Sequence, residues 1–218
     1  MLEFIRDTIE YQNFGFNTIT FSFFGTFFFS ILQAWSLLKQ NTKIKKKKSG
    51  QSLSITFFTY SCCYFFAFLV YGILNRSIGM IVNGLLGFCY IPILFNLHRF
   101  KGFFNINWIF LGLFSLMIPT VYLLKGELRN VFVLIGLFGL GIPLILQIRE
   151  MYKQKSTGSV EPRFLIVFGF SSIFWFIYGL VINNWIFIVF NPFSILLLGI
   201  AFGLYVKYRK LEIEKLII

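Results

Sequence analysis

Acidic residues are scarce in this chain. It has 8 Asp and Glu among 218 residues, against 20 Lys and Arg, and the acidic residues fall in predicted loops or end segments. The sequence has no HExxH motif, no GxSxG motif and no phosphate-binding glycine loop. Metal, nucleophilic and general acid–base catalysis therefore lack their usual residues, and we expect a protein that is not an enzyme.

Cysteine and histidine are also rare. The three cysteines, Cys62, Cys63 and Cys89, lie inside apolar segments, without a CxxC motif or a histidine partner. They are expected to be small buried hydrophobic residues, so neither a disulfide nor a metal site is predicted. The single histidine, His98, stands beside Arg99 at the end of an apolar run, where an interfacial role is expected. We predict no cofactor.

Apolar residues dominate the composition. The chain is 57% hydrophobic and 13% charged, and the charged residues crowd into gaps between long apolar runs. Hydrocarbon imposes this pattern on a helical bundle because it solvates neither charges nor unpaired backbone groups. Runs of bilayer-spanning length predict an all-α membrane protein with seven transmembrane helices. They lie near residues 17–38, 52–74, 77–98, 106–124, 129–149, 164–182 and 185–206.

The positive charge divides unevenly between the two sides of the predicted bundle. Arg6, Arg76, Lys125 and Arg129 fall on the side of the N-terminus, and the other Lys and Arg fall on the opposite side. Because positive loops stay cytoplasmic, we predict the N-terminus outside and the C-terminus in the cytoplasm, with the cell membrane as the location. This topological role explains the basic residues, so no nucleic acid partner is expected, and membrane lipid is the expected surrounding of the bundle. The N-terminus lacks the basic start of a signal peptide, so no cleavage is expected.

A shift of 107 residues aligns two stretches of the sequence. It matches Gln40 with Gln147, Lys48 with Lys155, Ser52 with Ser159, Tyr71-Gly72 with Tyr178-Gly179 and, after one insertion, Asn83 with Asn191. Predicted helices 1 to 3 and 5 to 7 are therefore two copies of one unit. An odd number of helices would invert the second copy, so helix 4 is needed to keep the copies parallel.

The repeat predicts two parallel three-helix bundles joined by a linker helix, a 3+1+3 plan. Duplication of this kind in membrane proteins usually places a transport path between the copies. The predicted parts are an N-terminal extracellular or luminal segment (1–16), a first repeat (17–100), the linker helix (104–125), a second repeat (128–208) and a cytoplasmic tail (209–218).

Several motifs resemble those of a known family. SVEPRF (159–164), Gly169-Phe170, WFIYG (175–179) and Phe190-Asn191 are similar to the SWEET (MtN3/saliva) sugar transporters of the PQ-loop superfamily. Asn83-Gly84 resembles a motif of their first repeat. The resemblance spans nearly the whole chain, strongly in the second copy and loosely in the first. It implies a sugar pocket between the two bundles.

The SWEET resemblance implies a substrate site formed by Asn83, Asn191, Trp175 and Phe68. An amide offers donors and an acceptor to sugar hydroxyls, and an aromatic face suits the C–H side of a sugar. For the two asparagines the alternative is hydrogen bonding between helices. For Trp175 the alternative is core packing or a place in an interfacial belt.

The same resemblance implies an extracellular gate at Tyr71 and Tyr178. Both tyrosines lie near the outer end of the second helix of their copy, where an ordinary aromatic belt is the alternative.

The resemblance also implies a hinge and cytoplasmic gate at Pro143, Pro162 and Gln147. Proline frees a backbone carbonyl and allows a helix to bend. The first copy has no proline in its first two helices, so the two copies are expected to bend unequally. The literal Pro-Gln pair is absent, because leucine precedes both Gln33 and Gln147.

We predict facilitative, bidirectional uniport of a sugar or a similar neutral polar solute by alternating access. A mono- or disaccharide is the expected substrate. Without an Asp or Glu inside the apolar runs, passive transport is favoured over proton coupling. Two alternatives stay open: a PQ-loop carrier of an amino acid or another small metabolite, and a sorting receptor with the PQ-loop fold. The sequence also leaves open whether the chain forms a homo-oligomer.

Overall fold

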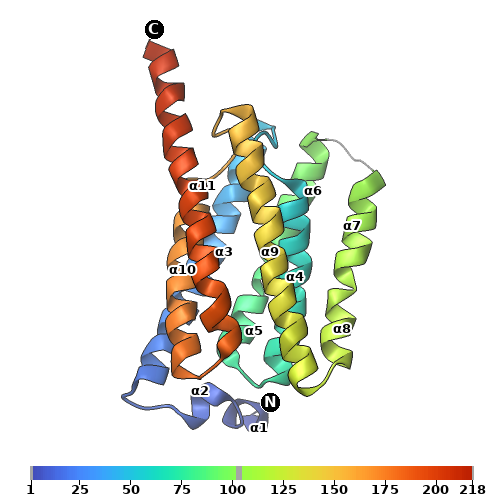
Figure 1. Cartoon of the computed structure of the whole chain (residues 1–218), viewed down its shortest axis with the longest axis vertical. Coiled ribbons are helices and arrows are strands. Elements are labelled where there is room, and N and C mark those ends of the chain that lie inside the picture. The colour runs from blue at the N-terminus through green and yellow to red at the C-terminus, as the bar shows by residue number, and fades with distance from the viewer. Residues whose placement is uncertain (1, 102–104, 218) are drawn as a thin grey trace.

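The computed structural model describes residues 2–101 and 105–217, and this part of the chain is entirely helical with connecting loops (Figure 1). The two short helices at the N-terminus are α1 (Leu2–Arg6) and α2 (Ile9–Gln12). The long helices are α3 (Thr18–Lys47), α4 (Ile55–Leu74), α9 (Gly126–Gln154), α10 (Pro162–Val181) and α11 (Trp185–Ile217). Two further helices are broken into the pairs α5 (Ile78–Gly84) with α6 (Leu86–Lys101), and α7 (Asn105–Ser115) with α8 (Met117–Leu123).

The all-α prediction is confirmed. Among the described residues, six helices are long and apolar enough to cross a membrane, and they correspond to six of the seven predicted spans. The predicted fourth span falls on α7 and α8, of which Ile109–Leu123 counts as a shorter apolar helix. The predicted linker 104–125 begins at a residue outside the described part of the chain.

The end segments contain more helix than the sequence indicated. The predicted N-terminal segment 1–16 contains α1 and α2. The predicted tail 209–218 continues α11 as far as Ile217. Leu, Glu and Lys are good helix formers, so this sequence extends the helix beyond its apolar run.

Helix α3 shows how these sequences bury their polar side chains. Its buried residues include Ser22, Thr26, Ser30, Gln33, Ser36 and Gln40, and these recur at steps of three or four along one face. Its exposed residues include Phe21, Phe24, Phe28, Ile31, Trp35 and Leu38. This is the reverse of a helix in a water-soluble protein, and it suits a helix with hydrocarbon outside and a polar interior.

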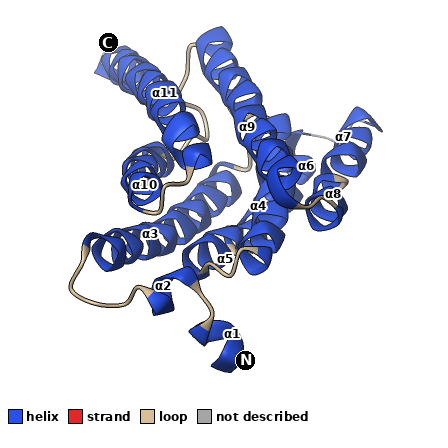
Figure 2. Ribbon diagram, turned by 60° about the horizontal axis from the view of Figure 1, so that its bottom comes forward, coloured by secondary structure: helices blue, strands red, loops and turns tan. Residues whose placement is uncertain are grey.

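The six long or paired helices other than α7–α8 pack in a closed ring. Around the ring, α3 contacts α5 and α6, which contact α4, followed by α9, α11 and α10, which returns to α3. Figure 2 shows this order, with α7 and α8 outside the ring against α4. We call α3–α6 the first half and α9–α11 the second half. The halves meet where α3 packs on α10 and where α4 packs on α9, two contacts that the 107-residue shift exchanges.

The turns that leave α4 and α10 have the same geometry. Arg76 and Asn183, related by the 107-residue shift, have φ angles of 51° and 52°. The N–H of Ser77 donates to the Gly72 carbonyl at 3.0 Å, and that of Asn184 donates to the Gly179 carbonyl at 2.8 Å. The repeat seen in the sequence is therefore also a repeat of backbone conformation.

Gly72 and Gly179 are required by close helix packing at these turns. A Cβ atom on Gly72 would lie 2.8 Å from the Ile81 backbone nitrogen, and one on Gly179 would lie 2.6 Å from the Phe187 Cβ atom. We expect either alanine substitution to lower the free energy of unfolding by about 1–3 kcal/mol, because the following helix must move away. Thermal unfolding in detergent measures this effect.

Gly169→Ala and Gly199→Ala are the matched controls. Nothing lies within 4 Å of a Cβ atom at either position, and both glycines lie inside helices. Alanine should leave their unfolding temperature unchanged or raise it slightly, because alanine is the better helix former. If all four variants unfold alike, the close packing at Gly72 and Gly179 does not limit stability.

Candidate functional site

A cavity lies between the two halves and is lined by side chains from every helix of the ring. About 100 Å³ of it is open to water-sized molecules. A single buried water needs roughly 10–15 Å³ on the same measure, so the cavity has room for several polar groups. Its polar lining residues are Gln33, Ser61, Tyr64, Asn83, Tyr90, Ser171, Ser172, Asn191 and Ser194. Among the described lining residues none is charged.

All four predicted substrate-binding residues line this cavity. Asn83 lies on α5 and Asn191 on α11, and each side chain is buried with 5% of its surface exposed. Phe68 of α4 and Trp175 of α10 meet across the cavity, edge to face, with ring centroids 6.0 Å apart. The structure therefore brings together, from opposite halves, the residues that the repeat had paired in the sequence.

The two asparagines have different hydrogen-bond partners. The Asn83 amide nitrogen donates to Ser30 Oγ at 3.0 Å and to Gln33 Oε1 at 2.8 Å. The Asn191 amide nitrogen donates to the Phe187 carbonyl of its own helix at 2.8 Å. Asn83 thus lines the cavity and also joins α5 to α3 by hydrogen bonds between helices, which was the alternative considered from the sequence. Both of its amide hydrogens are used, so its carbonyl oxygen is the group it can offer to a solute.

Gln33 is a cavity residue that the sequence did not identify as one. The sequence singled it out only because leucine precedes it where the family has proline. In the structure Gln33 holds Asn83 and lines the cavity beside it. Its position on the polar face of α3, one or two turns from Ser30 and Gln40, is the sequence signal that could have found it.

Two matched positions of the cavity lining carry buried hydroxyls that have no hydrogen-bond partner among the described residues. They are the Tyr64 hydroxyl on α4 and the Ser171 hydroxyl on α10. A buried hydroxyl without a partner is costly, and such groups in native proteins usually serve a ligand or an ordered water. These two positions are related by the 107-residue shift, so each half supplies one.

The two predicted gate tyrosines lie beyond the cavity aromatics, at the end of the bundle where α1 and α2 lie. We call this the N-terminal end. Tyr71 stacks on Phe68 with centroids 6.0 Å apart, and Tyr178 meets Trp175 edge to face at 5.6 Å. Both tyrosines are fully buried, which does not fit an interfacial belt facing lipid. The Tyr71 hydroxyl donates to Asn130 Oδ1 of α9 at 2.9 Å, so it bonds to the opposite half.

The predicted hinge prolines occupy different kinds of position. Pro162 is the first residue of α10, where proline starts a helix and breaks no hydrogen bond. Pro143 falls within α9, and its side chain is outside the described residues.

Gln147 and its counterpart Gln40 form reciprocal clamps at the opposite end of the bundle. The Gln147 amide nitrogen donates to the Ser52 carbonyl, and its Oε1 accepts from the Ser54 N–H at 2.7 Å. Gln40 bonds in the same way to the Ser159 carbonyl at 2.8 Å and the Glu161 N–H at 2.8 Å. Each half therefore holds the loop that precedes the second helix of the other half.

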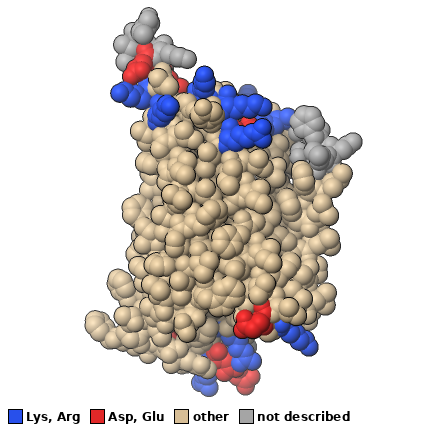
Figure 3. Space-filling view, in the orientation of Figure 1, with Lys and Arg blue, Asp and Glu red and all other residues tan. Residues whose placement is uncertain are grey.

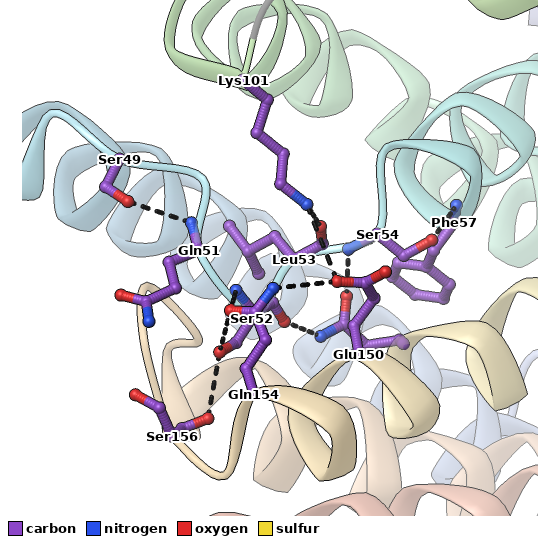
Figure 4. Close-up of polar contacts among 11 residues, drawn as sticks. Ser49, Gln51, Ser52, Leu53, Ser54, Phe57, Lys101, Glu150, Gln154 and Ser156 are labelled. Carbon is purple, nitrogen blue, oxygen red and sulfur yellow. Dashed lines mark hydrogen bonds and ion pairs between the residues drawn. The ribbon is translucent and has the colours of Figure 1, made fainter.

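Further side chains strengthen these clamps. Figure 4 shows Gln154 and Glu150 of α9 directed at the first-half loop, where the Ser52 N–H donates to Gln154 Oε1 at 2.9 Å. Lys101 of α6 donates to the Leu53 carbonyl at 2.5 Å and lies 3.9 Å from the Glu150 carboxylate. Lys47 of α3 donates to the Gly158 carbonyl of the second-half loop at 2.6 Å.

Charged side chains lie mainly at the two ends of the bundle. Figure 3 shows Lys and Arg gathered at the end that carries the C-terminus, which we call the lysine-rich end. Acidic and basic residues mix at the N-terminal end, and the visible surface between the two ends is uncharged. This belt has the properties of a surface that faces hydrocarbon.

Comparison with known proteins agrees with this geometry. The family described as "Sugar efflux transporter for intercellular exchange" (MtN3_slv) matches residues 128–212. A solved structure described as a eukaryotic SWEET transporter is similar to the chain with a TM-score of 0.63. The match covers 88% of this chain and 97% of that one at 13% sequence identity, so it shows the fold alone. No curated protein matches the chain.

The resemblance to the SWEET family is confirmed. SWEET proteins form a transporter family, which supports the prediction that the chain is not an enzyme. The chain is an integral, multi-pass membrane protein. The SWEET sequence match lies in the second half, where the resemblance in sequence was strong, and the similarity of fold covers 88% of the chain.

Proposed function

We propose that the chain carries a sugar or a similar neutral polar solute across the membrane by facilitative uniport. The observation that carries this proposal is the cavity between the halves, where two matched asparagines and two aromatic rings meet and no described lining residue is charged. Amides and hydroxyls bind sugar hydroxyls, and aromatic rings bind the apolar face of a sugar. The family and fold similarity to SWEET transporters supports the same substrate class.

The proposed substrate-binding residues are Asn83, Asn191, Trp175 and Phe68. The partnerless hydroxyls of Tyr64 and Ser171 support a hydroxylated substrate, because a sugar could bond to both. The uncharged lining favours a neutral solute over an amino acid, whose two charges would need compensation on leaving water. It equally disfavours a receptor for a charged peptide terminus.

The proposed mechanism is alternating access between two three-helix units, α3–α6 and α9–α11, which α7 and α8 connect. Tyr71 and Tyr178 would close the N-terminal end of the cavity, and Gln40 and Gln147 would close the lysine-rich end. Pro143, Pro162 and Gln147 are the proposed hinge residues. The packing supports this division, because the contacts between the halves, α3 with α10 and α4 with α9, are related by the repeat.

The proposed orientation places the lysine-rich end in the cytoplasm and the N-terminus outside the cell. The excess of Lys and Arg at one end of the bundle supports it.

Uptake of labelled sugars into proteoliposomes tests the proposed function. We expect at least one of glucose, sucrose and related sugars to enter faster than into empty vesicles, and an imposed proton gradient to leave the rate unchanged. Lack of flux for a broad panel of mono- and disaccharides contradicts a sugar substrate. Acceleration by an imposed pH gradient contradicts uniport.

A further inference from the structure

The N-terminal segment folds back across one end of the helix ring. Helices α1 and α2 lie under the ends of the long helices in Figure 1, and α2 packs against α3 and α5. The Ile9 N–H donates to the Arg76 carbonyl at 3.0 Å, and the Arg76 guanidinium pairs with Asp7. These contacts fasten the segment to the turn between α4 and α5, in the first half.

Glu10 projects from this segment into the bundle, where only 4% of its surface is exposed. Its Oε1 accepts from Ser77 Oγ at 2.6 Å, from the Gly79 N–H at 3.0 Å and from the Tyr178 hydroxyl at 2.8 Å. Its Oε2 accepts from the Ile78 N–H at 3.0 Å. An ionised carboxylate only accepts hydrogen bonds, and here four donors surround it.

The donors to Glu10 come from both halves. In the first half, Ser77 caps the start of α5, and Ile78 and Gly79 are its first residues. In the second half, Tyr178 lies in the last turn of α10. Tyr178 in turn packs against the cavity residue Trp175. The Glu10 carboxylate therefore ties the two halves together at a residue next to the cavity, and separation of the halves at this end must break the bond to Tyr178.

We propose that the N-terminal segment is a latch, and that Glu10 is the positioning residue through which it holds Tyr178 in the closed gate. The inference rests on the proposed alternating access. The latch stabilises states closed at the N-terminal end, and its release raises the population open to that side. The latch lies outside both repeats, so it holds Tyr178 and has no repeat-related counterpart at Tyr71.

A cysteine placed in the cavity reports the open population without any sugar. The probe is Ser171→Cys, labelled by a membrane-impermeant methanethiosulfonate that is applied to each side of the membrane in turn. The three native cysteines stay in place, and the chain without Ser171→Cys provides the blank.

Glu10→Gln is expected to raise the labelling rate from the N-terminal side about tenfold. The glutamine NH₂ group faces donors instead of accepting from them, and a hydrogen bond to a charged group is worth about this factor. Tyr178→Phe removes only the bond between the halves and should give a similar rise. Combined with Glu10→Gln, it should add little, because both remove the same bond.

Glu3→Gln is the matched control. It changes an exposed carboxylate on the same segment and should leave the labelling rate unchanged. If Glu10→Gln fails to fold, the labelling rate of Tyr178→Phe alone still tests the latch. Unchanged labelling in Tyr178→Phe overturns the latch, as does an equal rise from both sides.

Sugar uptake by the same chains with native Ser171 separates the latch from the proposed function, because Ser171→Cys removes a hydroxyl from the cavity lining. Faster labelling in a chain that carries no sugar supports the latch and contradicts the function. Unchanged labelling in a chain that carries sugar contradicts the latch alone.

Discussion

Asn191→Ala is expected to lower sugar uptake into proteoliposomes by about tenfold or more, with little change in the unfolding temperature. Asn191 lines the cavity, and among the described residues its amide donates to the Phe187 carbonyl of its own helix, so the substitution removes no hydrogen bond between helices. A lost hydrogen bond to a substrate hydroxyl costs about 0.5–1.5 kcal/mol, and more where a partner stays unpaired. Removal of the Asn191 amide is therefore expected to weaken sugar binding and to slow uptake.

Asn83→Ala is expected to reduce both uptake and stability. Its amide bonds to Ser30 and Gln33 on α3, and the substitution leaves these buried groups without their partner. We expect the free energy of unfolding to fall by about 1–3 kcal/mol. Both alanine variants should therefore lose sugar uptake, but only Asn83→Ala should also show a clearly lower unfolding temperature.

Val189→Ala provides the control on α11. Val189 stands two residues from Asn191 and is 49% exposed, so it should affect neither uptake nor stability. Full uptake in Asn191→Ala would show that the cavity asparagine of the second half does not bind the substrate.

Gln147→Ala and Gln40→Ala are expected to destabilise the lysine-rich end of the bundle. Each substitution leaves a buried carbonyl and a buried or half-buried N–H of the opposite loop without a partner. Each unsatisfied group costs about 1–3 kcal/mol, so the unfolding temperature in detergent should fall clearly in both variants. Similar losses are expected because the two clamps have the same pattern of bonds.

Gln51→Ala is the matched control for the clamps. Gln51 lies in the same first-half loop, and its side chain is exposed. Its replacement should leave the unfolding temperature within measurement error. A loss as large as that of Gln147→Ala would show that the loop itself is fragile and that the clamp contributes little.

The parts of the fold that follow from repetition could be predicted from the sequence. The apolar runs predicted the helices, because a chain in hydrocarbon must pair its backbone N–H and C=O groups with one another. The repeat paired Asn83 with Asn191 and Phe68 with Trp175, and all four residues line the cavity.

The contacts that break the repeat could not be predicted. Glu10 appeared as one acidic residue in an N-terminal segment, and only the folded chain brings it against Tyr178. Gln33 has no amide counterpart in the second half, where position 140 is leucine, so the repeat did not mark it. Gln40 and Gln147 follow the repeat, but their bonding partners could not be predicted either, since both bond to the backbone of distant loops and backbone groups leave no sequence signal.

Sugar counterflow tests alternating access in this cavity most directly. Proteoliposomes are loaded with a high concentration of the unlabelled transported sugar and diluted into a trace of the labelled sugar without any ion gradient. A carrier with one cavity that opens alternately should accumulate label above its equilibrium level for a short time, and Asn191→Ala should abolish this peak. A smooth rise to equilibrium in the wild-type chain would contradict alternating access.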